Sequence, residues 1–192
     1  MFVQFSFLAQ TGTDRQLAEH YYSNREFDKA LPYYEVLYKH EASKVNFSRL
    51  YECYTATKDL KEAEKLLKKQ WNMNKLDLEY PVMMGQFYED QGEISKATQI
   101  YDELIDELKP IASNVIGLFN AFKSKGKNDL AFKTITKGRS LLKTSYPLHF
   151  QFAEYYGAVG QTDKMIAEYL DLIDYNASYR STVEQLLTRQ IE

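Results

Sequence analysis

Apolar residues recur along most of this chain at intervals that place them on one face of an α-helix. Between residues 17 and 37 two such faces follow each other, with a short polar turn at residues 23–25 between them. The spacing predicts two short amphipathic helices, and helices of this length are marginal in isolation. The first face carries Leu17, Ala18 and Tyr21, and the second carries Ala30, Tyr34 and Leu37.

The same pattern returns every 33 or 34 residues. Because one such helix pair cannot bury its apolar faces alone, consecutive pairs are expected to stack on one another. A marker position, small in four of five cases, is occupied by Ala30, Ala63, Ala97, Ala131 and Met165. Nine residues before each marker stands a large aromatic residue, namely Tyr21, Tyr54, Tyr88, Phe122 and Tyr156. Four residues after each marker stand Tyr34, Leu67, Tyr101, Ile135 and Tyr169.

This unit resembles the tetratricopeptide repeat (TPR), a helix–turn–helix of about 34 residues. The resemblance covers residues 11–179 and implies an all-α protein, a right-handed α-solenoid of about five repeats followed by a C-terminal helix. The family's first-column tryptophan is absent from all five units. The expected repeats span about 11–44, 44–77, 78–111, 112–145 and 146–179, and residues 180–192 form a capping helix or the start of a further repeat.

Turn and cap residues refine these expectations. Thr13 or Asp14 can cap the first helix, which would then begin near that point. Glycines at positions 92, 126 and 160 stand where the first helix of a repeat must stop in a left-handed conformation. Gly138 lies inside the second helix of the fourth repeat, where glycine costs about 1 kcal/mol relative to alanine. That helix is expected to be the softest part of the array.

Residues 1–10 differ from the rest of the chain because they carry no charge and are mostly apolar. The segment is too short to span a membrane and lacks the basic start of a signal peptide. Its end, Ala9 followed by Gln10, is similar to the Ala-Gln junctions of exported TPR proteins of Bacteroidetes. This resemblance implies a remnant of a bacterial export signal and an exported or periplasmic protein. The alternative is a cytoplasmic protein whose apolar N-terminal tail packs on the first helix or is disordered.

Composition and motifs argue against several classes of function. The formal net charge is −3 and the isoelectric point is about 5.7, so no global basic field favours nucleic acid. The single cysteine, Cys53, excludes an internal disulfide and is expected to be an inert, partly buried thiol. The three histidines stand in separate repeats, without metal-ligand spacing, and no catalytic motif is present. We therefore expect a protein that is not an enzyme and holds no cofactor or metal.

By resemblance, the first helix of each repeat lines a concave groove that binds a peptide. Counted with Glu79, the charged positions of these helices hold six acidic and two basic residues. One sign of charge on a concave wall attracts the other, which favours a peptide with Lys or Arg. The expected groove residues are Arg15, Glu19, Tyr22, Glu52, Gln86, Glu89, Asp90, Asn120, Lys123, Phe150 and Glu154.

Two functions are compatible with this pattern. The first is a non-catalytic scaffold that binds a protein or peptide segment in the TPR groove. The second is an accessory region of a larger enzyme or of a secretion or assembly machine whose other domains lie outside this chain. Self-association through the ends of the array is a third, weaker alternative. The chaperone-type carboxylate clamp of the family is not expected, because Glu19 stands where that clamp needs asparagine.

Overall fold

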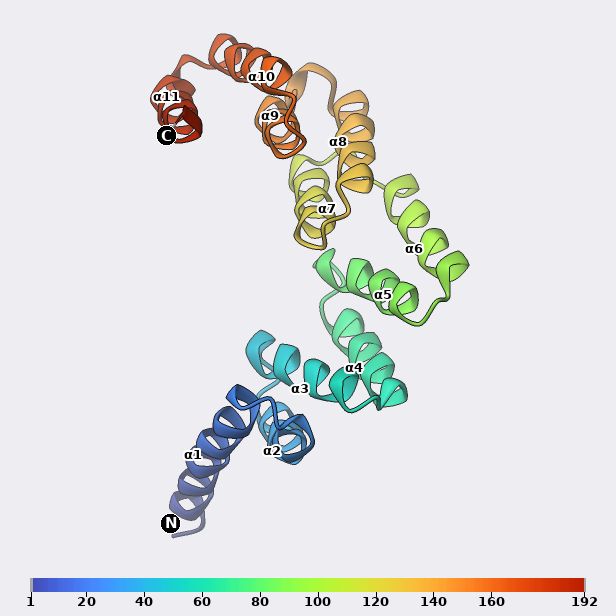
Figure 1. The fold of residues 1–192 in the computed structure, drawn as a ribbon, viewed down its shortest axis with the longest axis vertical. Helices are drawn as coiled ribbons and strands as arrows, with labels where there is room; N and C mark the ends of the chain where they lie inside the picture. The colour runs from blue at the N-terminus through green and yellow to red at the C-terminus, as the bar shows by residue number, and fades with distance from the viewer. Residues whose placement is uncertain (1, 192) are drawn as a thin grey trace. The chain divides into compact units, whose positions relative to one another are not determined.

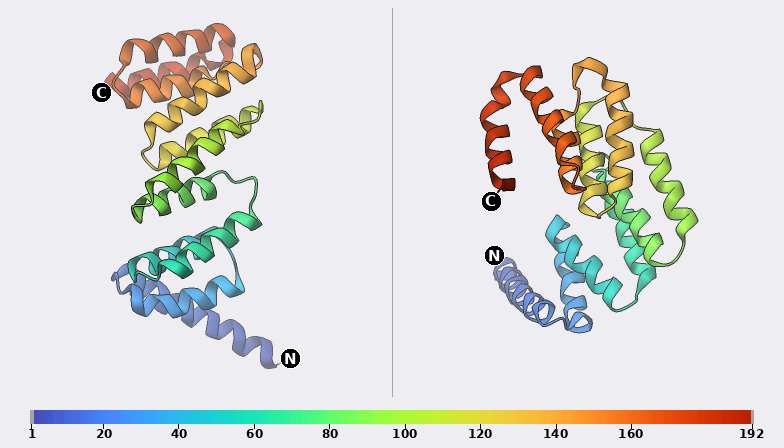
Figure 2. Two further views of the ribbon diagram at one scale, coloured as in Figure 1. Left: turned by 90° about the vertical axis from the view of Figure 1, so that its right-hand side faces the viewer. Right: turned by 45° about the horizontal axis from the view of Figure 1, so that its top comes forward.

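The computed structural model describes the backbone of residues 2–191 and the side chains of residues 12–143 and 145–188. Within this range the chain is helical and contains no β-strand, which confirms the predicted all-α class. The chain divides into two compact units, Met1–Lys75 and Leu76–Glu192. Each unit consists of antiparallel helix hairpins of the TPR-like kind, which are visible in Figures 1 and 2.

The first unit holds two hairpins, and its helices are α1 (Phe2–Ser23), α2 (Phe27–His40), α3 (Lys44–Ala56) and α4 (Leu60–Met73). Helix α1 begins at Phe2 and not near Thr13, because residues 2–10 contain no glycine or proline that would end a helix. The predicted N-terminal segment therefore continues α1 along the backbone, while its side chains lie outside the described ones. Its role as an export signal stays a prediction.

The second unit holds three hairpins and a last helix. Its helices are α5 (Glu79–Asp90), α6 (Ile94–Asp106), α7 (Ala112–Ser124), α8 (Asn128–Leu142), α9 (His149–Ala158), α10 (Thr162–Tyr175) and α11 (Arg180–Ile191), with short 3₁₀ turns at Lys143–Ser145 and Ala177–Tyr179. Helix α11 packs the buried Val183 and the half-buried Leu186 and Leu187 against the core of the α9–α10 hairpin. Whether this helix caps the array or begins a further repeat stays a prediction.

In the turn of every hairpin, the residue at one equivalent position has a left-handed backbone conformation. Positive φ values of 60° to 76° occur at Arg25, Lys58, Gly92, Gly126 and Gly160, at steps of 33, 34, 34 and 34 residues. In each turn the backbone N–H of the next residue donates to the carbonyl of the aromatic column, over 2.8–3.0 Å, as in Glu93 N to Tyr88 O. These are helix C-caps of the Schellman type. The glycine prediction is confirmed at its three positions, while the first two turns use a residue with a side chain.

The predicted columns form the cores of both units. All five marker residues are at most 2% exposed. The five residues four positions later are also buried. The aromatic column is less uniform, because only Tyr54 and Phe122 are buried while its other members are half-buried. Edge-to-face contact between Tyr101 of α6 and Phe122 of α7, and stacking of Phe132 of α8 on Tyr155 of α9, join successive hairpins of the second unit.

Two polar or small residues in the column seven positions after the marker have specific packing roles. Buried Gln70 accepts a hydrogen bond from Tyr38 Oη over 2.7 Å, so the tyrosine satisfies a polar group that would otherwise be costly. At Gly138, an added Cβ would lie 2.2 Å from Val115 Cγ1 of α7. Glycine is therefore required by the close approach of α7 and α8, which helix propensity alone does not reveal. The predicted softness of α8 stays a prediction.

No helix in the described part of the chain combines the length and the apolar character that crossing a bilayer requires.

The register of the repeats can be tested at the marker column. Replacing Ala63 or Ala97 by leucine forces extra methylenes between two closely packed helices and should lower the free energy of unfolding by about 1–3 kcal/mol. The same change at exposed Lys68 of α4 should alter it by less than about 0.5 kcal/mol. Urea denaturation of the three variants measures these values, and equal effects at all three sites would contradict the register.

The hairpin turns supply a second test. Lys58→Gly should raise the free energy of unfolding by about 0.5–1 kcal/mol, because a left-handed φ strains a residue with a Cβ but not glycine. Gly126→Lys should lower it by about 1 kcal/mol or more for the same reason. Lys125→Gly is the matched control, since Lys125 has φ −99° and gains nothing from glycine. A stabilisation by Lys125→Gly as large as that by Lys58→Gly would show that the left-handed turn is not the cause.

Alkaline pH should destabilise the fold. Burial raises the pKa of Cys53 from 9.0 to about 12, and burial also raises the pKa of Tyr34, Tyr54 and Tyr101 above 10.0. Because the folded pKa values exceed the unfolded ones, this contribution to stability is complete below pH 9 and is lost as the pH rises toward the folded values. Urea denaturation at several pH values from about 8 to 11 measures the loss.

Cys53→Ala serves as the control for this pH dependence, because it removes one of the contributing groups. In this variant the free energy of unfolding should fall less steeply with pH near pH 9. In the unaltered protein, Cys53 should react slowly with a thiol reagent until the chain unfolds. Constant stability across the alkaline range would contradict the burial of these groups as neutral acids.

Candidate functional site

Four of the predicted groove residues lie in the first unit, on α1 and α3. Arg15 Nη2 lies 3.3 Å from Glu41 Oε2, and both side chains are exposed. The Tyr22 hydroxyl donates to the Glu52 carboxylate, and burial together with this bond raises the pKa of Tyr22. Sequence reasoning missed Arg49 of α3, whose guanidinium lies 4.0 Å from the centre of the Tyr22 ring.

Arg15 and Glu19 also line an open hollow of about 620 Å³ along α1. The other residues of this hollow come from the same helix and its following turn. Most of them are exposed and polar, and the Asn24 amide lies 3.4 Å from His20 Nε2. Within the first unit, Tyr22, Glu52 and Arg49 therefore form a local cluster, and Glu19 lies near enough to Arg49 to interact with its charge.

The other predicted residues lie in the second unit, and most of their charges are paired. Lys127 at the start of α8 forms an ion pair with Glu89 of α5. Lys123 of α7 forms an ion pair with Glu154 of α9. Gln86 Nε2 donates to Asp90 Oδ1 over 2.7 Å. The two ion pairs join neighbouring repeats, whereas the Gln86–Asp90 bond lies within α5. The paired carboxylates therefore contribute less to an outward negative field than their number suggests.

The structure adds two cations to the charges that the sequence prediction counted for the groove. Arg49 and Lys127 lie outside the positions on which the prediction rests, yet their positive charges are beside Tyr22 and Glu89. No signal in the groove columns themselves could reveal these two cations, because they come from the middle of a helix and from a hairpin turn. The remaining predicted residues, Asn120 and Phe150, line two different cavities of the second unit.

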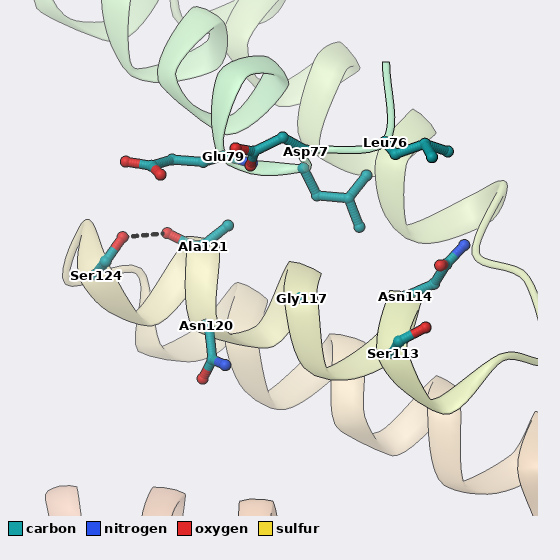
Figure 3. Close-up of a pocket in the computed structure, with 10 residues that line it drawn as sticks. Leu76, Asp77, Glu79, Ser113, Asn114, Gly117, Asn120, Ala121 and Ser124 are labelled. Atoms are coloured by element: carbon teal, nitrogen blue, oxygen red, sulfur yellow. Dashed lines mark hydrogen bonds between the residues drawn. The ribbon is translucent and has the colours of Figure 1, made fainter. Parts of the chain in front are cut away.

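Asn120 belongs to the larger of these two cavities, a groove of about 620 Å³ that we call the α7 groove. One wall is a face of α7, and the other is the segment Leu76–Glu79 that leads into α5 (Figure 3). The α7 residues of the groove share one face because they recur three or four positions apart. Their side chains are small or short, and they include a glycine and an alanine. The groove residues on α7 are Ser113, Asn114, Gly117, Asn120, Ala121 and Ser124.

The depth of the α7 groove depends on Gly117. A Cβ at this position would meet only Leu78 Cδ1, at 3.8 Å, so the glycine leaves open space beneath that leucine. Ser124 Oγ donates to the Ala121 carbonyl over 2.9 Å and stays close to its own helix. The Asn120 amide points away from the Leu76–Glu79 wall in Figure 3 and forms the outer edge of the groove.

The opposite wall gives the α7 groove its charge. Asp77 Oδ1 accepts the backbone N–H of Glu79 over 3.0 Å, which orders the entry into α5. Asp77 and Glu79 both line the groove, and none of its lining residues is Lys or Arg. Leu76 on the same wall is 97% exposed, an unusual position for a large apolar side chain. The groove therefore combines negative charge, short polar groups and one exposed apolar contact.

A second polar cluster lies between α8, α9 and α10. Arg139 Nη1 and Nη2 donate to the two Glu168 carboxylate oxygens over 2.9 and 2.7 Å. His149 Nδ1 lies 2.7 Å from Glu168 Oε2. With Asp171, His149 and Glu168 bring potential metal-ligating atoms within 4.8 Å of one another. Because the guanidinium already binds both oxygens of Glu168, this cluster acts as a partly buried ion pair between helices.

Comparison with known proteins gives a fold likeness only. No family model and no curated protein matches the chain. Among solved structures, the MamA protein is 17% identical, with 89% of this chain and 94% of that chain covered at a TM-score of 0.40. A thermophilic TPR protein of Thermus thermophilus, TTC0263, is 15% identical, with 93% and 99% covered at a TM-score of 0.40. Since these TM-scores are low, the repeat fold rests on the helix pairs and their regular spacing.

Proposed function

We propose that this chain is a non-catalytic scaffold that binds an extended, basic segment of a partner protein in the α7 groove. The observation that carries the proposal is the groove itself, whose lining brings the carboxylates of Asp77 and Glu79 together with short polar side chains and exposed Leu76. A segment with Lys or Arg would place its charge beside Asp77 and Glu79. A basic partner is also what the sequence predicts, and that prediction already counted Glu79 but not Asp77.

The shape of the groove supports an extended segment. Short side chains on α7 leave room for a peptide backbone, since they do not project far from the helix. The hydroxyl of Ser113 and the amide of Asn114 can exchange hydrogen bonds with backbone groups of such a segment. Exposed Leu76 offers an apolar contact at the edge, where a partner side chain would cover it.

Electrostatics should set the strength and salt dependence of this binding. Ion pairs near a protein surface contribute about 0.2–1 kcal/mol each, so two pairs with these half-buried carboxylates should give a modest affinity. Added salt screens such pairs over a Debye length of about 10 Å at 0.1 M. Binding should therefore weaken as ionic strength rises, and acidic segments should bind poorly.

The test compares synthetic peptides of equal length that are basic, neutral or acidic, measured by fluorescence anisotropy at low and high salt. The unaltered protein should prefer the basic peptide. The double variant Asp77→Asn and Glu79→Gln should bind it roughly tenfold more weakly at low salt and lose most of the salt dependence. Asparagine at position 77 can still accept the backbone N–H of Glu79, so the fold should be retained. Gly117→Leu should block binding by filling the groove while raising helix propensity.

The matched control is the double variant Asp102→Asn and Glu107→Gln, which removes the same charge from exposed positions of α6 and its end. It should leave affinity close to that of the unaltered protein. Preference for acidic peptides, or equal losses in the two double variants, would contradict the assignment of the α7 groove.

A further inference from the structure

One exposed face of α10 is apolar at positions where the earlier repeats are polar. The position five residues after the marker is exposed in all five repeats. Its residues are, in order, Glu35, Lys68, Asp102, Thr136 and Leu170. Leu170 is 55% exposed, and Ile166, one helical turn before it, is 37% exposed. Two large apolar side chains exposed side by side, in a column that is otherwise polar, indicate a contact surface.

These residues belong to a stripe along one side of α10. Ile166 and Leu170 are four positions apart and Ile173 follows three positions later, so the three side chains share a face. Ile173 is half-buried and packs against the core that α9, α10 and α11 share. Ala167 is exposed beside Ile166 and adds little bulk. We call these four residues the α10 stripe.

Acidic side chains lie at both ends of the exposed part of the α10 stripe. Asp163 lies three positions before its first residue, Asp174 lies four positions after Leu170, and both are exposed. Residues three or four apart are neighbours on a helix surface. Lys164 is the one basic residue of α10, and its ammonium lies 5.4 Å from the centre of the Tyr156 ring of α9. The stripe is therefore bordered by negative charge.

Charge and backbone chemistry distinguish among the possible occupants of this face. A second copy of the chain would meet it through a two-fold axis, so acidic ends would lie against acidic ends. An anionic membrane surface would repel the same carboxylates. An extended segment would bring unpaired backbone N–H and C=O groups against apolar side chains, because α10 bonds its own backbone groups within the helix. A helix arrives with these groups already paired.

We propose that the α10 stripe binds an amphipathic helix of a partner protein whose apolar face is bordered by Lys or Arg. Apolar side chains of that helix cover Ile166 and Leu170, as in other complexes in which a helix packs through residues at helical spacing. Its basic residues lie beside Asp163 and Asp174. The α10 stripe shares no residue with the α7 groove, and the inference does not depend on the proposed function.

The probe for this surface is a labelled, helix-forming peptide of about 18 residues, with leucines on one face and lysines along both borders. Two comparison peptides have the same length. In one, the same residues are reordered so that the leucines surround the helix, and in the other glutamate replaces lysine. Fluorescence anisotropy with the full, unaltered chain at low salt should show at least about tenfold tighter binding of the first peptide than of either comparison peptide.

Variants of the α10 stripe locate the binding. Ile166→Gln with Leu170→Gln should weaken binding of the lysine peptide about tenfold, because both contact residues lose apolar surface. The matched control is Ile94→Gln with Ile111→Gln, which removes two other exposed isoleucines and should leave the affinity unchanged. All four positions are exposed, and circular dichroism checks that both variants keep the helical fold.

Two charge variants separate this surface from the α7 groove. Asp163→Asn with Asp174→Asn should weaken binding at low salt and reduce its salt dependence, because screened carboxylates no longer contribute. The double variant that removes the two carboxylates of the α7 groove should bind the lysine peptide as the unaltered protein does. It tests the proposed function independently, since that function concerns extended peptides.

The proposal is overturned if unaltered protein binds the three peptides alike, a comparison that requires no variant to fold. It is also overturned if the Ile166 and Leu170 double variant keeps full affinity, or if the loss of the α7-groove carboxylates weakens helix binding as much. A dimer of the unaltered protein in analytical ultracentrifugation that disappears in this stripe variant would assign the face to a second copy and overturn the proposal as well.

Discussion

The close approach of the two helices in each hairpin is the contact on which the rest of this structure depends. In four of the five hairpins an alanine that is at most 1% exposed makes the approach possible, and bulky residues such as Tyr34 and Leu67 pack one helical turn away. The helices are too short to persist alone, so this contact has to form for either helix to be stable. The left-handed turn then returns the chain at the angle that the contact requires.

Contacts between hairpins follow from the same repetition. In the second unit, the rings of Tyr101 and Phe122 and those of Phe132 and Tyr155 meet between successive hairpins. The ion pairs of Lys127 with Glu89 and of Lys123 with Glu154 also join neighbouring repeats. Charged residues of the first helices thus serve the stacking of hairpins. A count of the acidic residues in these columns consequently overestimates the negative charge that can attract a partner.

The two cavities of the second unit arise where the repeats depart from regularity. The α7 groove exists because Gly117 removes a side chain opposite Leu78, and its charge comes from the connecting segment at Asp77. The smaller cavity lies at the irregular passage from α8 to α9, where the 3₁₀ turn Lys143–Ser145 and a left-handed Leu148 replace a simple turn.

The periodic features of this protein could be predicted from the sequence, because helix periodicity and a 34-residue repeat are local properties. The helix pairs, the buried marker column and the turn glycines at positions 92, 126 and 160 belong to this class. Of the predicted groove residues, only Asn120 and Phe150 line the two cavities discussed, and the sequence could place them only on the inner helices. Tertiary structure alone decided three features. These are the pairing of the carboxylates, the need for glycine at position 138, and the lack of a donor for Gln151. The physical reason is that each depends on side chains from different helices, whose distances no spacing along the chain specifies.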